Sequence, residues 1–121
     1  MFALTWSLGG ALMEEEREKF SEFLKNLSQV VPLPPTSLYE NYFNMENRNF
    51  ENWDRKVPLY QPPPDRKFGS ILVPTVDTVR YAWLLKQIMG LKKPAMFCGD
   101  SGTAKTVTVE SAFRDFDVDK Y

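Results

Sequence analysis

The chain contains no histidine, and this absence removes several kinds of site at once. Nucleophiles that depend on an imidazole base, histidine metal ligands and imidazole acid–base catalysis are all excluded. Cys98 is the only cysteine, so an intrachain disulfide and a multi-cysteine zinc site are excluded as well. We interpret Cys98 as a buried thiol at the end of a strand, in a reducing intracellular compartment.

An excess of charge of either sign is also missing. The chain has 15 basic and 16 acidic residues, which gives a formal net charge of −1. This balance provides no general electrostatic attraction to nucleic acid or to an anionic membrane, and we expect neither partner. The apolar start, residues 1–13, lacks the basic beginning of a signal peptide and is too short to span a bilayer. We interpret it as a core helix.

Residues 1–31 are predicted to be helical in two pieces, with Gly9-Gly10 as the weak point between them. In the second piece four apolar residues fall at i, i+3, i+4 and i+7: Phe20, Phe23, Leu24 and Leu27. We expect this stripe to be core packing, with a groove for a partner as the alternative. The prolines of residues 31–35 then end the helix.

Residues 34–72 carry many aromatic side chains but no sustained hydrophobic period. We interpret them as an extended connector with one or two short strands, wrapped over a neighbouring surface. Pro62-Pro-Pro64 favours polyproline geometry, which suits a stiff linker or, as the alternative, a ligand for an aromatic-lined groove.

Thr75 is predicted to cap a helix that runs to about Met89 and is terminated by Gly90. Its periodicity gives an inner and an outer face. The residues expected to face inward are Val76, Val79, Trp83 and Ile88, and those expected outside are Arg80, Lys86 and Gln87.

The apolar run 94–98 is predicted to be a strand, and a Gly-rich turn and a helix from about Ala104 follow it. The turn reads Gly99-Asp100-Ser101-Gly102-Thr103-Ala104-Lys105-Thr106. This order of strand, turn, Lys-Thr and helix is typical of a phosphate-binding loop. Glycines allow the backbone to aim its N–H groups inward and form an anion-binding nest at a helix N-terminus.

Two side chains of this loop have predicted roles. Lys105 would reach the β- and γ-phosphates of a nucleoside triphosphate, and the Thr106 hydroxyl would bind Mg²⁺. Ala104 departs from the strict pattern, which has glycine before the lysine; its methyl group is tolerable at negative φ and costly at positive φ. The alternative is a simple Gly-containing turn before a surface helix, with Lys105 solvated.

Hydrolysis needs further groups, usually an apolar strand that ends in acidic residues. No such strand follows Thr106, and Asp115, Asp117 and Asp119 fall at a frayed helix end. In this last helix Val109, Ala112, Phe113 and Phe116 repeat at helical spacing. We therefore predict no catalytic residue and expect the chain to be a piece of a larger catalytic unit.

The run 72–81, Leu-Val-Pro-Thr-Val-Asp-Thr-Val-Arg-Tyr, together with the loop 99–106, resembles a dynein heavy chain. So does the run 2–10, Phe-Ala-Leu-Thr-Trp-Ser-Leu-Gly-Gly, followed by a charged helix that carries Lys19-Phe20. The resemblance covers most of the chain. It points to the end of the second AAA+ module of the motor ring and the start of the third, and it is closer to axonemal than to cytoplasmic forms.

The resemblance implies a mixed α and β fold built from pieces of AAA+ P-loop ATPase modules. Residues 1–33 would be the helical end of one module, residues 34–72 the connector, and residues 73–121 the start of the next α/β core. Val73, Pro74 and Thr75 would lie beside the adenine of ATP or ADP, and Mg²⁺ would accompany the phosphates. The departure at Ala104 leaves open whether such a site hydrolyses nucleotide or only holds it.

The resemblance also implies the partners and the location. The partners would be the remainder of the heavy-chain ring, other dynein subunits and, through the parent motor, microtubules. The location would be the cytoplasm and cytoskeleton, in the axoneme of a cilium or flagellum. Two other readings stay open: a partial P-loop kinase or GTPase, and a non-enzymatic interaction fragment that uses the amphipathic helix and the Pro-aromatic segment.

Overall fold

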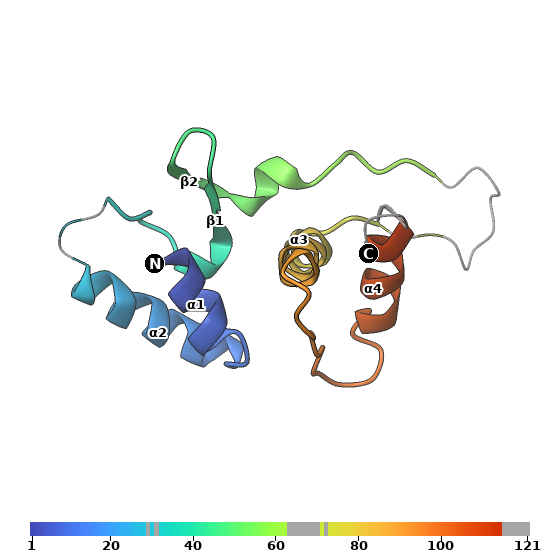
Figure 1. Ribbon diagram of the computed structural model, residues 1–121, viewed down its shortest axis with the longest axis horizontal. Helices are drawn as coiled ribbons and strands as arrows, with labels where there is room; N and C mark the ends of the chain where they lie inside the picture. The colour runs from blue at the N-terminus through green and yellow to red at the C-terminus, as the bar shows by residue number, and fades with distance from the viewer. Residues whose placement is uncertain (29, 31, 63–70, 72, 115–121) are drawn as a thin grey trace. The chain divides into compact units, whose positions relative to one another are not determined.

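The chain folds into two compact units, Met1–Arg55 and Lys56–Tyr121. The computed structural model describes residues 1–28, 30, 32–62, 71 and 73–114 (Figure 1). The first unit contains the helices α1 (Phe2–Gly9) and α2 (Glu14–Leu27), the 3₁₀ turn η1 (Leu38–Glu40) and the strands β1 (Asn41–Asn44) and β2 (Asn49–Asn52). The 3₁₀ turn η2 (Trp53–Lys56) follows, and the second unit contains α3 (Val76–Gly90) and α4 (Lys105–Arg114). The predictions for Pro63, Pro64, Asp115, Phe116, Asp117 and Asp119 lie outside the described residues.

The two predicted N-terminal helices are confirmed, with the break at the glycine pair. Helix α2 begins with three glutamates, whose negative charge suits the positive end of the helix dipole. The predicted stripe on α2 is only partly buried. Leu24 is buried, whereas Phe23 and Leu27 are more than half exposed. The face that packs inward is instead centred on Ser21 and Leu24, because the Ser21 hydroxyl accepts a hydrogen bond of 2.9 Å from the backbone N–H of Leu38.

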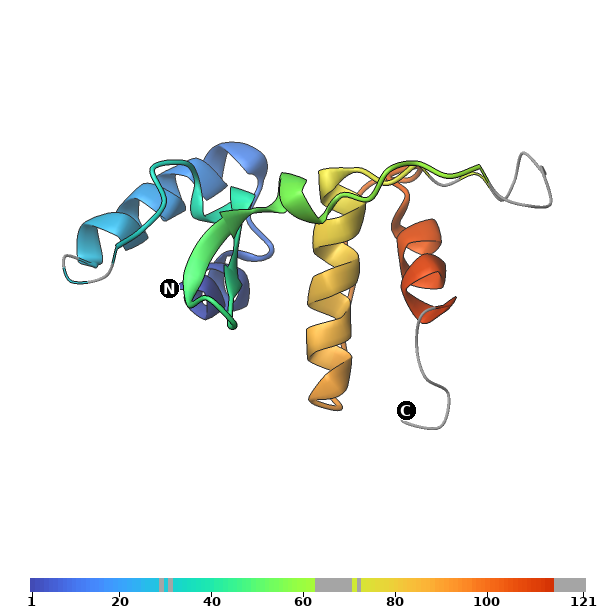
Figure 2. The same cartoon turned by 90° about the horizontal axis from the view of Figure 1, so that it is seen from above.

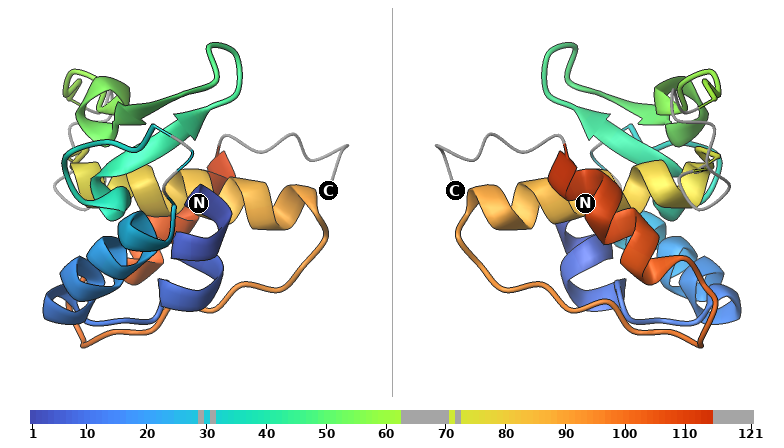
Figure 3. Two further views of the ribbon diagram at one scale, coloured as in Figure 1. Left: turned by 90° about the vertical axis from the view of Figure 1, so that its left-hand side faces the viewer. Right: turned by 90° about the vertical axis from the view of Figure 1, so that its right-hand side faces the viewer.

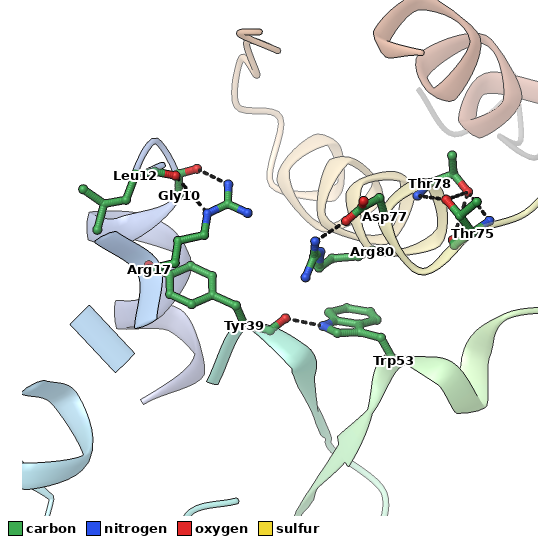
Figure 4. Close-up of polar contacts among 9 residues, drawn as sticks. All are labelled: Gly10, Leu12, Arg17, Tyr39, Trp53, Thr75, Asp77, Thr78 and Arg80. Carbon is green, nitrogen blue, oxygen red and sulfur yellow. Dashed lines mark hydrogen bonds and ion pairs between the residues drawn. The ribbon is translucent and has the colours of Figure 1, made fainter. Parts of the chain in front are cut away.

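Most of the buried apolar side chains of the first unit come from residues 34–72, which were predicted to be a connector. Leu38 and Trp53 have no exposed surface, and Tyr39 and Tyr42 are buried. The Trp53 indole N–H donates a hydrogen bond of 3.1 Å to the Tyr39 carbonyl, as Figure 4 shows. Its ring also lies 5.1 Å from the Tyr42 ring between centroids. A buried indole is stabilised only when its N–H has a partner, and this geometry supplies one.

The two short strands expected in this region are confirmed as an antiparallel hairpin. Asn41 pairs with Asn52 and Asn44 with Asn49, so the hairpin closes over four residues that end at Arg48, where φ is 57°. Phe43 and Phe50 face each other across the strands with ring centroids 5.3 Å apart. Such cross-strand aromatic pairs are a main source of stability in a hairpin.

Glu51 gathers the polar side chains of the hairpin around its carboxylate. The Tyr42 hydroxyl donates at 2.7 Å and the Asn44 amide at 2.9 Å, and the Asn47 amide donates as well. These hydrogen bonds favour the charged carboxylate and lower the pKa of Glu51 from 4.5 to about 2, the Tyr42 bond having the largest effect.

Arg17 joins the end of α1 to the start of α2 (Figure 4). Its guanidinium donates to the carbonyl oxygens of Leu12 at 2.9 Å and Gly10 at 3.3 Å. It also lies over two aromatic rings, 5.3 Å from the centroid of Tyr39 and 5.9 Å from that of Trp6. The planar guanidinium therefore satisfies carbonyls that a helix end leaves without partners, while its face contacts aromatic surface.

In the second unit, α3 begins at the predicted cap. The Thr75 hydroxyl accepts from the N–H of Thr78, and the Thr78 hydroxyl accepts from the N–H of Thr75 at 2.8 Å. The prediction that the helix terminates at Gly90 is confirmed, because α3 ends at that residue. The reversal lies at Lys92, where φ is 54°, and the backbone N–H groups of Lys92 and Lys93 close the helix end on Met89 and Ile88.

Helices α3 and α4 contact each other (Figure 2). Their buried side chains are Leu85, Thr108 and Ala112. Leu85 is absent from the predicted inner face, whose members Val76, Val79, Trp83 and Ile88 are all half-buried. Arg80, predicted to lie outside, forms an ion pair with Asp77 and places its guanidinium 5.3 Å from the Tyr81 ring centroid. None of the described helices is long and apolar enough to cross a membrane.

Residues 94–98 were predicted to form a strand, and this prediction is wrong. Figure 3 follows this segment from the end of α3 to the start of α4 as extended backbone without strand pairing. A β-strand needs a neighbouring strand for its N–H and C=O groups, and the described residues of the second unit contain none. Phe97 contacts α3, with its ring 6.3 Å from that of Tyr81. Cys98, expected to be buried, is exposed.

Replacing Gly9 with alanine is expected to destabilise the first unit by about 2 kcal/mol, because overpacking outweighs the better helix propensity of alanine. The new Cβ would lie 2.0 Å from the Tyr39 hydroxyl and 2.6 Å from the Phe20 ring. Urea denaturation followed by tryptophan fluorescence measures the change. Ser7→Ala, on the exposed side of the same helix, is the control and should change stability by less than about 0.5 kcal/mol. Equal effects of the two substitutions would contradict the close approach at Gly9.

The stability of the hairpin should depend on pH in the acidic range. The pKa of Glu51 is lower in the folded state, about 2, than its ordinary value of 4.5, so ionised Glu51 stabilises the fold above pH 4.5. That contribution should be lost progressively as the pH falls from 4.5 towards 2. Hydrogen exchange or chemical denaturation at several pH values would measure it. Glu51→Gln should remove this part of the pH dependence, whereas Glu46→Gln, on the exposed hairpin tip, should leave it unchanged.

Candidate phosphate-binding loop

The loop 99–106 connects the extended segment to α4, and three of its residues have positive φ. The values are 151° at Gly99, 81° at Gly102 and 57° at Ala104. A concentration of left-handed backbone within six residues produces a tight turn that ordinary loops do not need. The loop therefore has the backbone character expected for a nest of N–H groups.

Both glycines are favoured by their positive φ. A Cβ at Gly102 would meet no atom within 4 Å, so only the backbone conformation favours glycine there. A Cβ at Gly99 would lie 3.4 Å from the Thr103 hydroxyl oxygen and 4.0 Å from the Lys105 ammonium nitrogen. These are ordinary van der Waals distances, so at Gly99 too the positive φ, and not a lack of space, favours glycine.

Ala104 has positive φ, the conformation in which its methyl group is costly. With φ at 57° its methyl group stands close to the following carbonyl oxygen, which costs about 1–2 kcal/mol for an L-residue other than glycine. Ala104 nevertheless starts the helix, because its carbonyl accepts from the N–H of Thr108 at 2.9 Å and from the Thr108 hydroxyl at 2.8 Å. The substitution of Gly by Ala in the motif preserves the turn at the expense of backbone strain.

Lys105 bends back over the loop instead of extending away from it. Its ammonium group donates to the carbonyl oxygen of Gly99 at 2.8 Å, to that of Asp100, and to the hydroxyl oxygen of Thr103 at 3.0 Å. The Thr103 hydroxyl donates in turn to the Asp100 carbonyl at 2.8 Å. The three acceptors therefore hold the positive charge against the turn.

The first turn of α4 adds further anion-binding groups. Lys105, Thr106 and Val107 are its first three residues, and backbone N–H groups in a first helical turn have no partner inside the helix. The positive end of the helix dipole lies at the same place. The side chains of Asp100, Ser101 and Thr106 are exposed, so the structure brings the loop residues into one turn while leaving these three accessible.

The residues predicted for the adenine side precede α3. Val73 is exposed, Pro74 is half-buried, and the Thr75 hydroxyl is engaged in the helix cap. Their place beside an adenine stays a prediction. Among the described residues, no group of three or more acidic or cysteine side chains could hold a metal ion by itself.

One contact within the loop, between Thr103 and Lys105, was not predicted from the sequence. Thr103 was included only as a member of the loop, although its hydroxyl is an acceptor for Lys105. The contact joins residues two positions apart across Ala104, whose φ is positive. That conformation at Ala104 could not be known from an alanine in the sequence.

Two family models match the chain. Residues 1–55 match the dynein heavy chain AAA lid domain, and residues 60–121 match the P-loop containing dynein motor region. The break between the two matches falls close to the division between the two compact units.

Individual relatives cover nearly the whole chain. The dynein-1-alpha heavy chain of the flagellar inner arm I1 complex of Chlamydomonas reinhardtii is 36% identical over 97% of this chain. Dynein axonemal heavy chain 10 of Homo sapiens is 36% identical over 93%, and the cytoplasmic dynein heavy chain of Dictyostelium discoideum is 32% identical over 98%. The chain spans about 3% of the length of each of these relatives.

Ala104→Gly should stabilise the loop by about 1 kcal/mol, because glycine adopts positive φ without the steric cost of a methyl group. Hydrogen exchange of the Thr108 amide, which bonds to the residue 104 carbonyl, should become slower. Ala112→Gly is the matched control: Ala112 is buried inside α4, so the same change should there destabilise the helix by about 1 kcal/mol and speed exchange. Faster exchange at Thr108 in Ala104→Gly would contradict the strain.

Proposed function

Because this chain belongs to the dynein heavy chain family, we propose that its second unit binds ATP or ADP together with Mg²⁺ inside a motor ring. The observation that carries the proposal is the Lys105 ammonium held within a turn of positive-φ residues at the start of α4. Fixed N–H groups, a helix dipole and one cation at a single place form the chemistry that binds a polyphosphate.

The groups of the loop fit this ligand. Residues 99–104 supply the turn, Lys105 supplies a charge to the β- and γ-phosphates, and the Thr106 hydroxyl is an exposed oxygen for Mg²⁺. Val73, Pro74 and Thr75 are proposed for the adenine side. When bound, Mg²⁺ neutralises phosphate charge. This chain's own residues bind and orient the nucleotide, and the proposal assigns none of them a catalytic role.

The first unit is proposed to be the helical end of the preceding module. Its match to an AAA lid domain supports this proposal, and so does its separate core around Trp53. Within the parent protein, the remainder of the heavy-chain ring and other dynein subunits would be the partners. The nucleotide site would contribute to ATP-driven movement along microtubules, which the chain would reach only through the parent motor.

The proposed location is the cytoskeleton, in the axoneme of a cilium or flagellum. The names of the relatives support it, since one is a flagellar inner-arm chain and another an axonemal heavy chain. Two relatives with 36% identity are of this kind, whereas the cytoplasmic chain of Dictyostelium discoideum is 32% identical.

The test is Mg²⁺-dependent binding of a fluorescent ATP analogue to the 121-residue chain. Lys105→Ala should weaken binding by at least about tenfold, because a charge-assisted contact to phosphate is lost. Lys93→Ala is the matched control, since Lys93 is an exposed lysine outside the loop, and it should leave binding unchanged.

Equal affinities for the Lys105→Ala variant and the unmodified chain would contradict the assignment of Lys105. The absence of any binding at millimolar analogue would contradict the proposal for this chain. Inorganic triphosphate should compete with the analogue, because the proposed contacts are mainly to phosphate.

A further inference from the structure

The ammonium group of Lys105 has its hydrogen-bonding capacity fully used inside the loop. An ammonium has three N–H donors, and three oxygen atoms accept from it: the carbonyls of Gly99 and Asp100 and the hydroxyl of Thr103. A phosphate oxygen can therefore bind Lys105 only by replacing at least one of these acceptors.

Thr103 is the one side chain in this set, and its hydroxyl is oriented for the task. It donates its proton to the Asp100 carbonyl at 2.8 Å, which leaves its lone pairs for the Lys105 ammonium at 3.0 Å. The contact is thus built from three residues of the loop.

We propose that Thr103 is a positioning residue that holds the Lys105 ammonium on the loop's own oxygens when no nucleotide is bound. The proposal rests on the proposed function of the loop and adds an internal competitor to it. Phosphate and the Thr103 hydroxyl compete for the same N–H donor of Lys105. The contact therefore lowers the affinity for nucleotide.

The hydroxyl is the contact that a phosphate displaces first. It is a neutral acceptor on a rotatable side chain, whereas the two carbonyls belong to the backbone of the turn. Both hydrogen bonds have the ionised ammonium as donor, but the phosphate oxygen also carries a negative charge that the hydroxyl lacks, so Coulomb attraction favours the phosphate. The exchange is therefore favourable, and rotation of the Thr103 side chain is enough to permit it.

The experiment compares Thr103→Val with Thr103→Ser in the full 121-residue chain. Valine has nearly the shape of threonine but no hydroxyl, and serine keeps the hydroxyl. The first readout, without nucleotide, is the hydrogen exchange of the Lys105 ammonium protons in ¹⁵N-labelled protein. Exchange should be at least about threefold faster in Thr103→Val, because a lost hydrogen bond exposes a donor to water. Thr103→Ser should match the unmodified chain.

The second readout is the dissociation constant of the fluorescent ATP analogue with Mg²⁺. It should fall about threefold to tenfold in Thr103→Val, since the internal competitor is removed, and stay unchanged in Thr103→Ser. A residue that only stabilises the loop would give the opposite sign, because its loss would weaken binding.

The outcomes separate this inference from the function on which it rests. Binding that is weaker or unchanged in Thr103→Val, with the unmodified chain still binding, would overturn the competition and leave the nucleotide site standing. Unchanged ammonium exchange in Thr103→Val would overturn the contact itself. Binding by none of the three proteins would overturn the proposed function, and with it the competition, while the exchange data would still decide whether Thr103 holds Lys105.

Discussion

The arrangement of the loop 99–106 depends on the Lys105 ammonium and the oxygen atoms that surround it. A cation at the start of a helix meets the positive end of the helix dipole, which is unfavourable unless other groups compensate. Two carbonyls and one hydroxyl of the loop supply that compensation. The left-handed residues of the turn allow these carbonyls to face the ammonium, so backbone geometry and electrostatics are coupled there.

The first unit depends on a different constraint, the close approach of Tyr39 to helix α1. The Tyr39 hydroxyl donates to the Gly9 carbonyl at 2.9 Å, in a space that any Cβ at Gly9 would occupy. The Tyr39 carbonyl accepts from the Trp53 indole, and its ring lies beside the Arg17 guanidinium. Tyr39 therefore connects the helix end, the buried indole and the interhelical turn, and a small unit gains a defined core from one side chain.

Positive φ serves two different purposes in this chain. Arg48 completes the turn of the hairpin, and Lys92 completes the turn that follows α3. Both side chains are exposed to solvent. Ala104 combines positive φ with a position next to the charged lysine. Strain that persists where a polyphosphate would bind is typical of functional sites, because the surrounding contacts can hold a conformation that the residue alone disfavours.

Local patterns in the sequence were enough to predict the two N-terminal helices, the Thr75 cap, the short strands and the motif 99–106, because each depends on neighbouring residues. The resemblance to dynein heavy chains was carried by the same short runs and is confirmed by the family matches. Tertiary structure alone decided the burial of Leu38 and Trp53, the inward face of α2 and the contact between Thr103 and Lys105. It also decided that residues 94–98 are unpaired, because strand pairing requires a partner segment and not a local preference. Burial and side-chain contacts depend on residues distant in the chain, and no local pattern specifies which of them meet.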